Sequence, residues 1–385
     1  MNPEHWRDTT LGDFCPLIYG KSLPKRSRAS DGQVKVYGSG GVDGTHNEAL
    51  THGPTVIVGR KGTVGSVYFS PSPCWPIDTT YYIEDTDPML ARFKYFMLQV
   101  SGLEQLNYDS AVPGLKRLQA HSVRLRVPPT HLQRHIATAL GALDDLIENN
   151  RQRIEILEQM ARLLYREWFV HFRFPGYEGV ELIDSGLGPI PEGWRETRLA
   201  EACSLVMGQS PKSEYYNNIG EGLPFHQGVS DFGHRFPTHT KWTTVDNRVA
   251  EPGDILFSVR APVGRINVAP DRLVVGRGLS AIRALDDHQN FLLMQLKDKF
   301  AVEDSIGGGT IFNAVTKKDM ESIMLLRPTS LVVGQYEAVV APMTDLVANL
   351  SQQSIALREA RDLLLPRLVS GALDVSELDL GLVPV

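Results

Sequence analysis

A heptad pattern that occurs twice, 200 residues apart, constrains the fold of this chain more than any other feature. Apolar side chains recur from Ile136 to Trp168 in strict 4-3 alternation, the spacing of a coiled-coil seam. The same spacing returns from Tyr336 to Leu368 with polar exceptions. The first seam is Ile136, Leu140, Leu143, Ile147, Asn150, Ile154, Leu157, Ala161, Leu164 and Trp168, and the second is Tyr336, Val340, Met343, Val347, Leu350, Ser354, Leu357, Arg361, Leu364 and Leu368. The pattern predicts two long helices, each burying a narrow stripe.

The simplest partner of each helix is the other one. A helix of about 44 residues would be roughly 65 Å long and could not bury its seam alone. If the two helices run antiparallel with residue numbers summing to 504, Asn150 meets Ser354, and Arg361 lies beside Asp144 and Asp145. A polar pair near the centre fixes register at a cost in stability. A register shifted by one heptad, with Asn150 opposite Arg361, and a helix that packs only on its own domain both stay open.

The repeat continues upstream of each helix. "LGDFCPLIYGKSLPK" from Leu11 is similar to "LAEACSLVMGQSPKS" from Leu199, and "TVIVGRKGTVGSVYF" from Thr55 matches the pattern of "DILFSVRAPVGRINV" from Asp254. The Gly- and Pro-rich stretch "SGLGPIPEGWRE" joins the two copies, because this composition stops helices. We therefore divide the chain into a first globular domain, a long helix, a linker, a second globular domain, a second long helix and a tail, at residues 1–128, 129–173, 174–193, 194–328, 329–373 and 374–385.

Each globular part is predicted to contain short strands with Gly-rich turns. The clearest strand patterns are "VKVYGSGG", "PTVIVGRKG", "DILFSVRAPVG" and "RLVVGRGLSAIRAL", and helices are expected at 88–102 and 288–304. The predicted fold class is α+β, with two repeated α/β domains joined by two long antiparallel coiled-coil helices and related by a pseudo-two-fold axis.

Composition predicts a cytoplasmic globular protein. The chain is 42% hydrophobic and 22% charged, has no signal-peptide start and has no run of 18 apolar residues. Its three cysteines, Cys15, Cys74 and Cys203, are scattered and predicted to be ordinary buried thiols. The net charge of −6 comes from the linker, which has no Lys or Arg and four acidic residues, and from residues 329–385, which have three basic and seven acidic residues. Each globular part can therefore still present a basic face.

The sequence offers no convincing catalytic or metal motif. "YGKS" at 19–22 has Cys15 where a phosphate-binding loop needs Gly, and "VPPT" at 127–130 has neither the acceptor nor the aromatic ring of an adenine-methyltransferase motif. "HLQRH" lacks the Glu of a zinc-protease helix, Asp254 has no following Glu-x-Lys, and Gly307 to Gly309 are predicted to form a turn. We expect a non-enzymatic chain that binds no metal and no cofactor.

Basic and polar loops recur at matched places in both halves. Lys and Arg can bind phosphates or guanine edges, and Asn and Gln can read adenine, so these loops are candidate DNA contacts. The candidates are Lys21, Lys25, Arg26, Arg28, Arg60, Lys61, Lys116, Arg117, Gln209, Lys212, Asn217, Gln227, Arg260, Arg265, Lys317 and Lys318.

Over its whole length the chain resembles the specificity (S) subunits of Type I restriction-modification systems. The resemblance lies in "LLYREWFVHF" at 163–172, "LGPIPEGW" at 187–194, "MGQSPKSEYYN" at 207–217, "GDILFSVRAPVGR" at 253–265 and "LLLPRLVSGAL" at 363–373. It implies two target recognition domains, each reading one half of a split double-stranded DNA site, with the helices as a ruler. The unlike loops "YGKSLPKRSRASDG" and "MGQSPKSEYYNN" imply unlike half-sites.

The resemblance also implies partners. Two methyltransferase (M) subunits would bring S-adenosylmethionine and methylate adenine, and nuclease/translocase (R) subunits would bring ATP and Mg. Near the end of the first helix, Trp168 is predicted to be a seam residue and Phe172 a docking residue for the methyltransferase. Two other classes remain: a self-contained restriction or methyltransferase enzyme, and a coiled-coil scaffold or DNA-binding regulator without methyltransferase partners.

Overall fold

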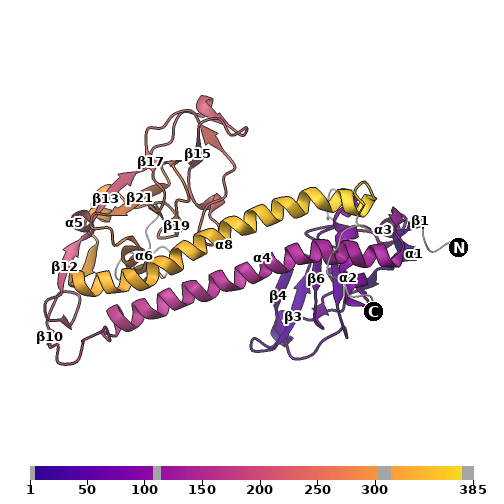
Figure 1. Cartoon of the computed structure of the whole chain (residues 1–385), viewed down its shortest axis with the longest axis horizontal. Helices are drawn as coiled ribbons and strands as arrows, with labels where there is room; N and C mark the ends of the chain where they lie inside the picture. The colour runs from indigo at the N-terminus through magenta and orange to yellow at the C-terminus, as the bar shows by residue number, and fades with distance from the viewer. Residues whose placement is uncertain (1–4, 107–113, 302–313, 375–385) are drawn as a thin grey trace. The chain divides into compact units, whose positions relative to one another are not determined.

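The chain divides into two compact units (Figure 1). The computed structural model describes residues 5–106, 114–301 and 314–374, so Gly307 to Gly309 and nearly all of the acidic tail lie outside the described residues. The first unit contains residues 1–151 and 352–385, and the second contains residues 152–351. Each unit therefore combines one globular part with a portion of both long helices.

The two predicted long helices are present as α4 (Thr130–Tyr165) and α8 (Ser330–Ser370). Both helices begin just after a segment that contains proline. The residue before a proline disfavours the helical conformation, so neither helix can readily start earlier in the chain. α4 is followed by a π-helical turn, η3 (Arg166–Val170). α8 stays helical through Pro342 and ends before Gly371, whose φ of +76° suits the glycine that commonly follows a helix.

The first unit contains two sheets and a strand pair, with one large hydrophobic cluster and two small ones. The four-stranded sheet has the order β2-β8-β5-β6, the three-stranded sheet has the order β4-β3-β7, and β1 pairs with β9. The strands are β1 (Arg7–Thr10), β2 (Ile18–Tyr19), β3 (Val34–Gly38), β4 (Gly41–His46), β5 (Thr55–Gly59), β6 (Val67–Ser70), β7 (Trp75–Pro76), β8 (Thr80–Glu84) and β9 (Arg124–Val127). The helices of this globular part are α1 (Leu11–Phe14), α2 (Pro88–Gln99) and α3 (Arg117–His121).

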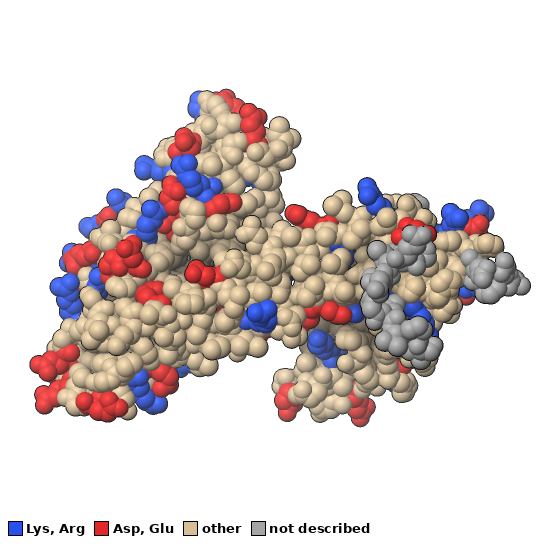
Figure 2. Space-filling model, viewed as in Figure 1, with Lys and Arg blue, Asp and Glu red and all other residues tan. Residues whose placement is uncertain are grey.

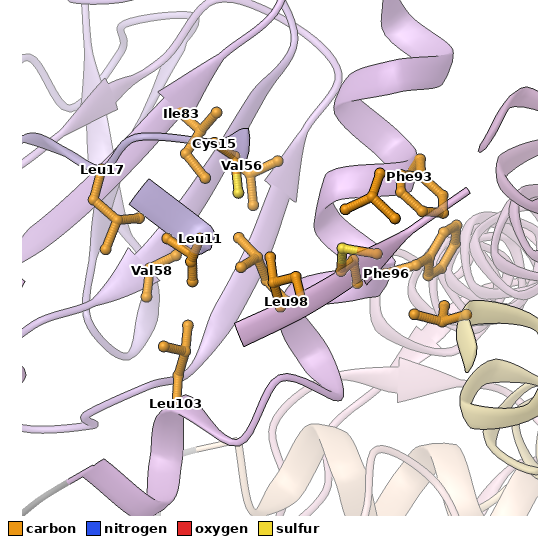
Figure 3. Packing of buried hydrophobic residues seen from close by; sticks show 14 of the residues in the cluster. Leu11, Cys15, Leu17, Val56, Val58, Ile83, Phe93, Phe96, Leu98 and Leu103 are labelled. Atoms are coloured by element: carbon orange, nitrogen blue, oxygen red, sulfur yellow. The ribbon is translucent and has the colours of Figure 1, made fainter. Parts of the chain in front are cut away.

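Helix α2 supplies much of the first core. Asp87 caps it by accepting hydrogen bonds from the backbone N–H of Met89 and Leu90, and Pro88 occupies its first turn. Its Phe93 and Phe96 are fully buried in the cluster that also holds residues of β5 and β8 (Figure 3). Burying such rings stabilises the fold by a few kcal/mol each.

The second unit repeats this topology. Its sheet β13-β21-β18-β19 corresponds to β2-β8-β5-β6, and β12 pairs with β22 as β1 pairs with β9. A five-stranded sheet has the order β14-β16-β15-β20-β17. The strands are β12 (Arg195–Arg198), β13 (Cys203–Met207), β14 (Tyr216–Asn217), β15 (Leu223–His226), β16 (Trp242–Thr243), β17 (Val249–Ala250), β18 (Ile255–Ser258), β19 (Ile266–Val268), β20 (Leu273–Val275), β21 (Leu279–Ala284) and β22 (Met324–Arg327). The helices are α5 (Leu199–Ala202), α6 (Gln289–Lys299) and α7 (Lys317–Glu321).

The α+β class and the strand patterns are thus confirmed. The helices expected at 88–102 and 288–304 are present but shorter, as α2 and α6, and residues 302–304 lie outside the described residues. The three cysteines are buried and free, also as expected. The Gly- and Pro-rich linker forms a small hairpin of β10 (Leu182–Ile183) and β11 (Ile190–Pro191). Ile190 and Trp194 from this segment are buried in an aromatic cluster with Phe169 of η3, so the linker is tethered to the helix end by packing.

Candidate nucleic-acid interface

The same tight turn occurs in both units, where it joins a strand of one sheet to a strand of another: β7 to β8 in the first unit and β20 to β21 in the second. In the first unit the N–H of Thr80 donates to the carbonyl of Ile77 at 2.9 Å, and in the second the N–H of Leu279 donates to the carbonyl of Gly276 at 2.9 Å. Asp78 and Arg277 occupy the second position of these turns, and both are exposed. Each unit therefore presents one side chain at an equivalent tip.

A glycine lets a second segment lie against each turn. Gly20 donates to the carbonyl of Thr80 at 3.1 Å, and Gly208 donates to that of Leu279 at 2.9 Å. A Cβ at Gly20 would lie 2.1 Å from the carbonyl oxygen of Ile77, and a Cβ at Gly208 would lie 2.1 Å from that of Gly276. Only glycine permits this approach, which brings the following residues, Lys21 and Gln209, to the same edge.

In the first unit, two arginines lie over one exposed aromatic ring. The guanidinium carbon of Arg117 lies 4.7 Å from the ring centroid of Tyr19, and that of Arg60 lies 5.0 Å from it. Arg60 also donates to the backbone carbonyl of Asp78 at 3.0 Å. Cation–π contacts hold these guanidinium groups at the surface without neutralising them. Together with the exposed Lys61, they form a positive edge suited to phosphate contacts.

The densest basic run, "KSLPKRSR", is only partly available. Arg28 donates to the carbonyl of Leu23 at 3.1 Å and to the carboxylate of Asp43 at 3.0 Å, and 10% of its side chain is exposed. Lys25 also approaches Asp43, at 3.3 Å, and the hydrogen bond from Arg28 is the main cause that lowers the pKa of this carboxyl group. Arg28 thus fixes its loop, whereas Lys21 and Arg26 remain exposed.

The second unit contains an open groove of about 510 Å³. Its lining includes three cations, Lys241, Arg260 and Arg277, together with Gln227 and one carboxylate, Asp231. The groove thus combines positive charge with amide and guanidinium donors, the groups that bind phosphates and base edges.

A histidine pair lies next in sequence to lining residues of this groove, since His226 stands between Phe225 and Gln227, and His239 precedes Thr240. Nε2 of the buried His226 lies 2.9 Å from Nδ1 of His239, whose other ring nitrogen lies 3.3 Å from Asp271. Burial and then the neighbouring His239 lower the pKa of His226 to about 4. His226 is therefore neutral at pH 7, and the chain of rings ties the end of β15 to the segment that leads to Lys241.

The remaining candidates of the second unit have mixed roles. The Asn217 amide donates to the carbonyl of Glu221 and accepts from the N–H groups of Ile219 and Glu221, so it shapes its own loop. Lys212 lies 3.7 Å from Glu214, and Lys317 lies 3.4 Å from Glu321. The other exposed candidates here are Gln209, Arg265 and Lys318, and in the first unit Lys116 is also exposed.

Four contributors were missed from the sequence: Tyr19, Asp78, Lys241 and Arg277. The one available signal was "GRG" at 276–278, where glycines flank a cation as they do in a turn. Tyr19 becomes relevant only because the fold brings together Arg60 and Arg117, which are distant in sequence.

The helix contacts within the first unit match the antiparallel register with the sum of 504. Arg361 donates to Asp144 at 2.8 Å, and both side chains are largely buried. Asn150 and Ser354, the polar pair of that register, are both buried, at 5% and 4% exposure. Ile136 and Leu140 share a buried cluster with Leu368.

Within the second unit the same register continues. The Trp168 and Tyr336 rings lie 6.0 Å apart, and Tyr336 donates to the carbonyl of Ala161 at 3.2 Å. Trp168 therefore lies in the helix seam. Phe172 has a φ of +57° and packs edge-on against Trp194 at 5.5 Å beside the linker cluster, where it stays half-buried. Its role in docking a partner stays a prediction.

Surface charge does not form one large field of a single sign on the face drawn in Figure 2, where basic and acidic side chains are interspersed. Among the described residues, no three His, Cys, Asp or Glu side chains are arranged to hold a metal ion. In the same part of the chain, no helix is long and apolar enough to cross a membrane.

Comparison with known proteins identifies the family. Residues 3–159 match the family model for the Type I restriction modification DNA specificity domain. The putative type I restriction enzyme MjaX specificity subunit of Methanocaldococcus jannaschii is 32% identical over 268 residues, which cover 68% of this chain and 62% of that relative's length. The chain belongs to the family of type I restriction-modification specificity subunits.

Two further comparisons extend over more of this specificity subunit. The type I restriction enzyme MjaIX specificity subunit of the same archaeon is 25% identical over 342 residues, covering 84% of this chain and 78% of the relative. The crystal structure of a type I restriction-modification S subunit from M. genitalium has 17% identity and a TM-score of 0.62, covering 96% of this chain and 97% of the other. The latter likeness supports the fold of the specificity subunit.

Proposed function

We propose that this specificity subunit is a non-catalytic DNA-recognition protein that reads an asymmetric, bipartite target in double-stranded DNA. The observation that carries the proposal is the cationic groove of the second unit, formed at the same topological position as the Tyr19, Arg60 and Arg117 cluster of the first. Each unit then reads one half-site. The two edges differ in charge and in aromatic content, which favours unlike half-sites.

Catalysis is assigned to partner subunits. Two methyltransferase subunits would supply S-adenosylmethionine and methylate adenines, and nuclease/translocase subunits would supply ATP hydrolysis and Mg for cleavage. This chain would direct both activities in a cytoplasmic complex of a bacterium or archaeon. The membership of the chain in the specificity-subunit family supports this division of roles.

Exposed apolar side chains on the long helices are suited to docking the methyltransferases. In the second unit Ile156, Met160 and Leu163 lie at helical spacing beside the seam and are 56%, 47% and 60% exposed. In the first unit Ile355 and Leu363 of α8 are similarly exposed. Burial of such side chains under a partner lowers the free energy, so we propose them as docking residues in addition to Phe172.

A double substitution tests the docking surface. We expect Met160→Glu with Leu163→Glu to abolish co-purification of the methyltransferase through the second unit while changing the melting temperature little, because exposed positions contribute little to stability. Ile219→Glu, at a more exposed apolar residue of the same unit (84% exposed), is the control. Undiminished co-purification would remove these helix residues from the docking surface.

The methylation pattern tests the function as a whole. The chain is co-expressed with its methyltransferase subunit in a host lacking adenine methylation, and modified adenines are mapped across the genome. We expect a split motif with a fixed gap, methylated on opposite strands and with unlike halves. A stable complex without any motif would favour a scaffold or regulator, and methylation by the chain alone would indicate a self-contained enzyme.

A further inference from the structure

We infer that Arg277 reads guanine and Asp78 reads cytosine, each in a G·C pair of its own half-site. This inference rests on the proposed DNA-recognition function and deepens it, because it assigns base chemistry to one residue in each unit. Arginine presents two donors that match O6 and N7 of guanine, whereas a carboxylate accepts from the exocyclic amine of cytosine.

The two positions are equivalent in the fold, as the surrounding hydrogen bonds show. The residue before each tip donates to the end of a parallel neighbouring strand: Ile77 to Tyr37 at 2.9 Å, and Gly276 to His226 at 2.8 Å. One residue earlier, the backbone carbonyl accepts from the N–H of the residue that follows the close-approach glycine: Pro76 from Lys21 at 3.0 Å, and Val275 from Gln209 at 2.9 Å. Asp78 and Arg277 therefore start from corresponding backbone positions and carry opposite charge.

The backbone around Arg277 sets it beside Gln227. A Cβ at Gly276 would lie 2.7 Å from the Cα of Gln227, and a Cβ at Gly278 would lie 2.4 Å from its carbonyl oxygen. The two glycines thus allow the end of β15 to press against the turn. Arg277 and Gln227 consequently line one groove, with the N–H of Arg277 itself bound by the hydroxyl of Ser210 at 3.2 Å.

The guanidinium of Arg277 is available for a ligand. Among the described residues no carboxylate pairs with it, and the one acidic residue of the groove, Asp231, lies 3.6 Å from His226 instead. Arg260 and Lys241 line the same groove and can bind the phosphates on either side. This leaves Arg277 to direct its planar fork toward a base edge.

Asp78 has the complementary setting. Its backbone carbonyl is held by Arg60, while its carboxylate makes no hydrogen bond or ion pair with the residues that the structure describes. Gly38 stands at the position equivalent to Gln227, so no side chain competes with the carboxylate there. A carboxylate is repelled by phosphates, and it gains only where it accepts from an amine of a base.

Methylome mapping of substituted complexes tests both assignments. The wild type, Arg277→Ala, Arg277→Lys and Asp78→Ala are each co-expressed with the methyltransferase subunit. The controls are Arg272→Ala, an exposed arginine that pairs with Glu251 at 3.3 Å, and Asp31→Ala, an exposed aspartate of the first unit. We expect Arg277→Ala to relax one G·C position in one half-site by roughly 5- to 100-fold, with Asp78→Ala doing so in the other. Arg277→Lys should restore little of the guanine preference, because lysine lacks the planar guanidinium group that makes two parallel hydrogen bonds.

The outcomes separate the two levels of the proposal. A wild type without a split motif overturns the DNA-recognition function itself. A split motif that Arg277→Ala weakens evenly at all sequences, with rescue by Arg277→Lys, makes Arg277 a phosphate contact and overturns its assignment. A motif unchanged by Asp78→Ala overturns the cytosine assignment. If an alanine variant melts early, Arg277→Met and Asp78→Leu replace it, because these side chains have a similar size and no group that can hydrogen-bond a base, and the same relaxation is required.

Discussion

The Glu158 carboxylate of α4 lies 3.2 Å from the guanidinium of Arg235, and this ion pair joins the globular part of the second unit to that unit's portion of α4. The Arg235 side chain is 4% exposed and that of Glu158 is 15% exposed. His234 approaches the second carboxylate oxygen at 3.2 Å, and Nε of Arg235 has no hydrogen-bond partner among the described residues. The guanidinium is therefore compensated chiefly by one carboxylate.

We expect Glu158→Gln to destabilise the second unit by about 3 kcal/mol, because a buried guanidinium loses its counter-charge. The double variant Glu158→Leu with Arg235→Leu should be destabilised less, because both buried charges are removed together. Urea unfolding followed by tryptophan fluorescence measures both, with Glu359→Gln on the exposed face of α8 as control. Equal losses for the single and double variants would show that the pair contributes through packing alone.

The helix register can be locked chemically. We expect cysteines placed at Asn150 and Ser354 to form a disulfide in the folded protein, because both positions are buried in the seam of the first unit. A matched pair at Asn150 and Arg361 should stay reduced, since seven residues displace it by about 10 Å along the helix. After proteolysis, non-reducing electrophoresis shows whether the two peptides that carry the cysteines are joined by a disulfide. Closure of the second pair in place of the first would establish the register shifted by one heptad.

Acidification should loosen the second unit through His226. Its pKa in the fold is about 4, below the ordinary 6.5, so the unfolded chain binds more protons between these values. The free energy of unfolding is therefore highest above pH 6.5 and falls as the pH is lowered toward 4. At pH 5 the loss amounts to about 2 kcal/mol. His226→Gln should flatten the pH dependence of urea unfolding between pH 7 and 5. His52→Gln, at an exposed histidine, should leave it as in the wild type.

The close-approach glycines should tolerate no side chain. We expect Gly20→Ala and Gly208→Ala each to destabilise their unit by about 1–3 kcal/mol, because the added methyl group would overlap a backbone carbonyl oxygen. Gly334→Ala is the control, since open space surrounds this helical glycine, and the change should stabilise α8 by about 0.5–1 kcal/mol. Thermal melting ranks the three, and an unchanged melting temperature for Gly20→Ala would mean that the turn can move aside.

Much of the architecture could be predicted from the sequence because periodic patterns report it directly. The seam from Ile136 and its copy from Tyr336 predicted two helices, and the contact between Arg361 and Asp144 is the one that the register requires. The strand patterns are alternating or continuous apolar runs, and such runs can be recognised without knowing the tertiary structure.

The candidate DNA-binding edge of the first unit was harder to predict, because it depends on how segments that are distant in sequence come together in the fold. Tyr19 meets Arg60 and Arg117 only once β2, β5 and α3 have assembled. The local contacts of a basic or amide residue are also not visible in the sequence: Arg28 donates to Asp43, and Asn217 donates to the carbonyl of Glu221 in its own loop. The left-handed backbone conformation of Phe172, which packs against Trp194, is a third feature of this kind.

The paired turns separate what the fold must conserve from what it can change. Gly20 and Gly208 have no room for a side chain, whereas the side chains of Asp78 and Arg277 are exposed at the tips of the turns and can be replaced without a steric clash. A library randomised only at the two tips should consequently remain rich in folded members while sampling many base preferences. New target sequences would then be reachable by single steps, each taken in one half of the molecule without retuning the other.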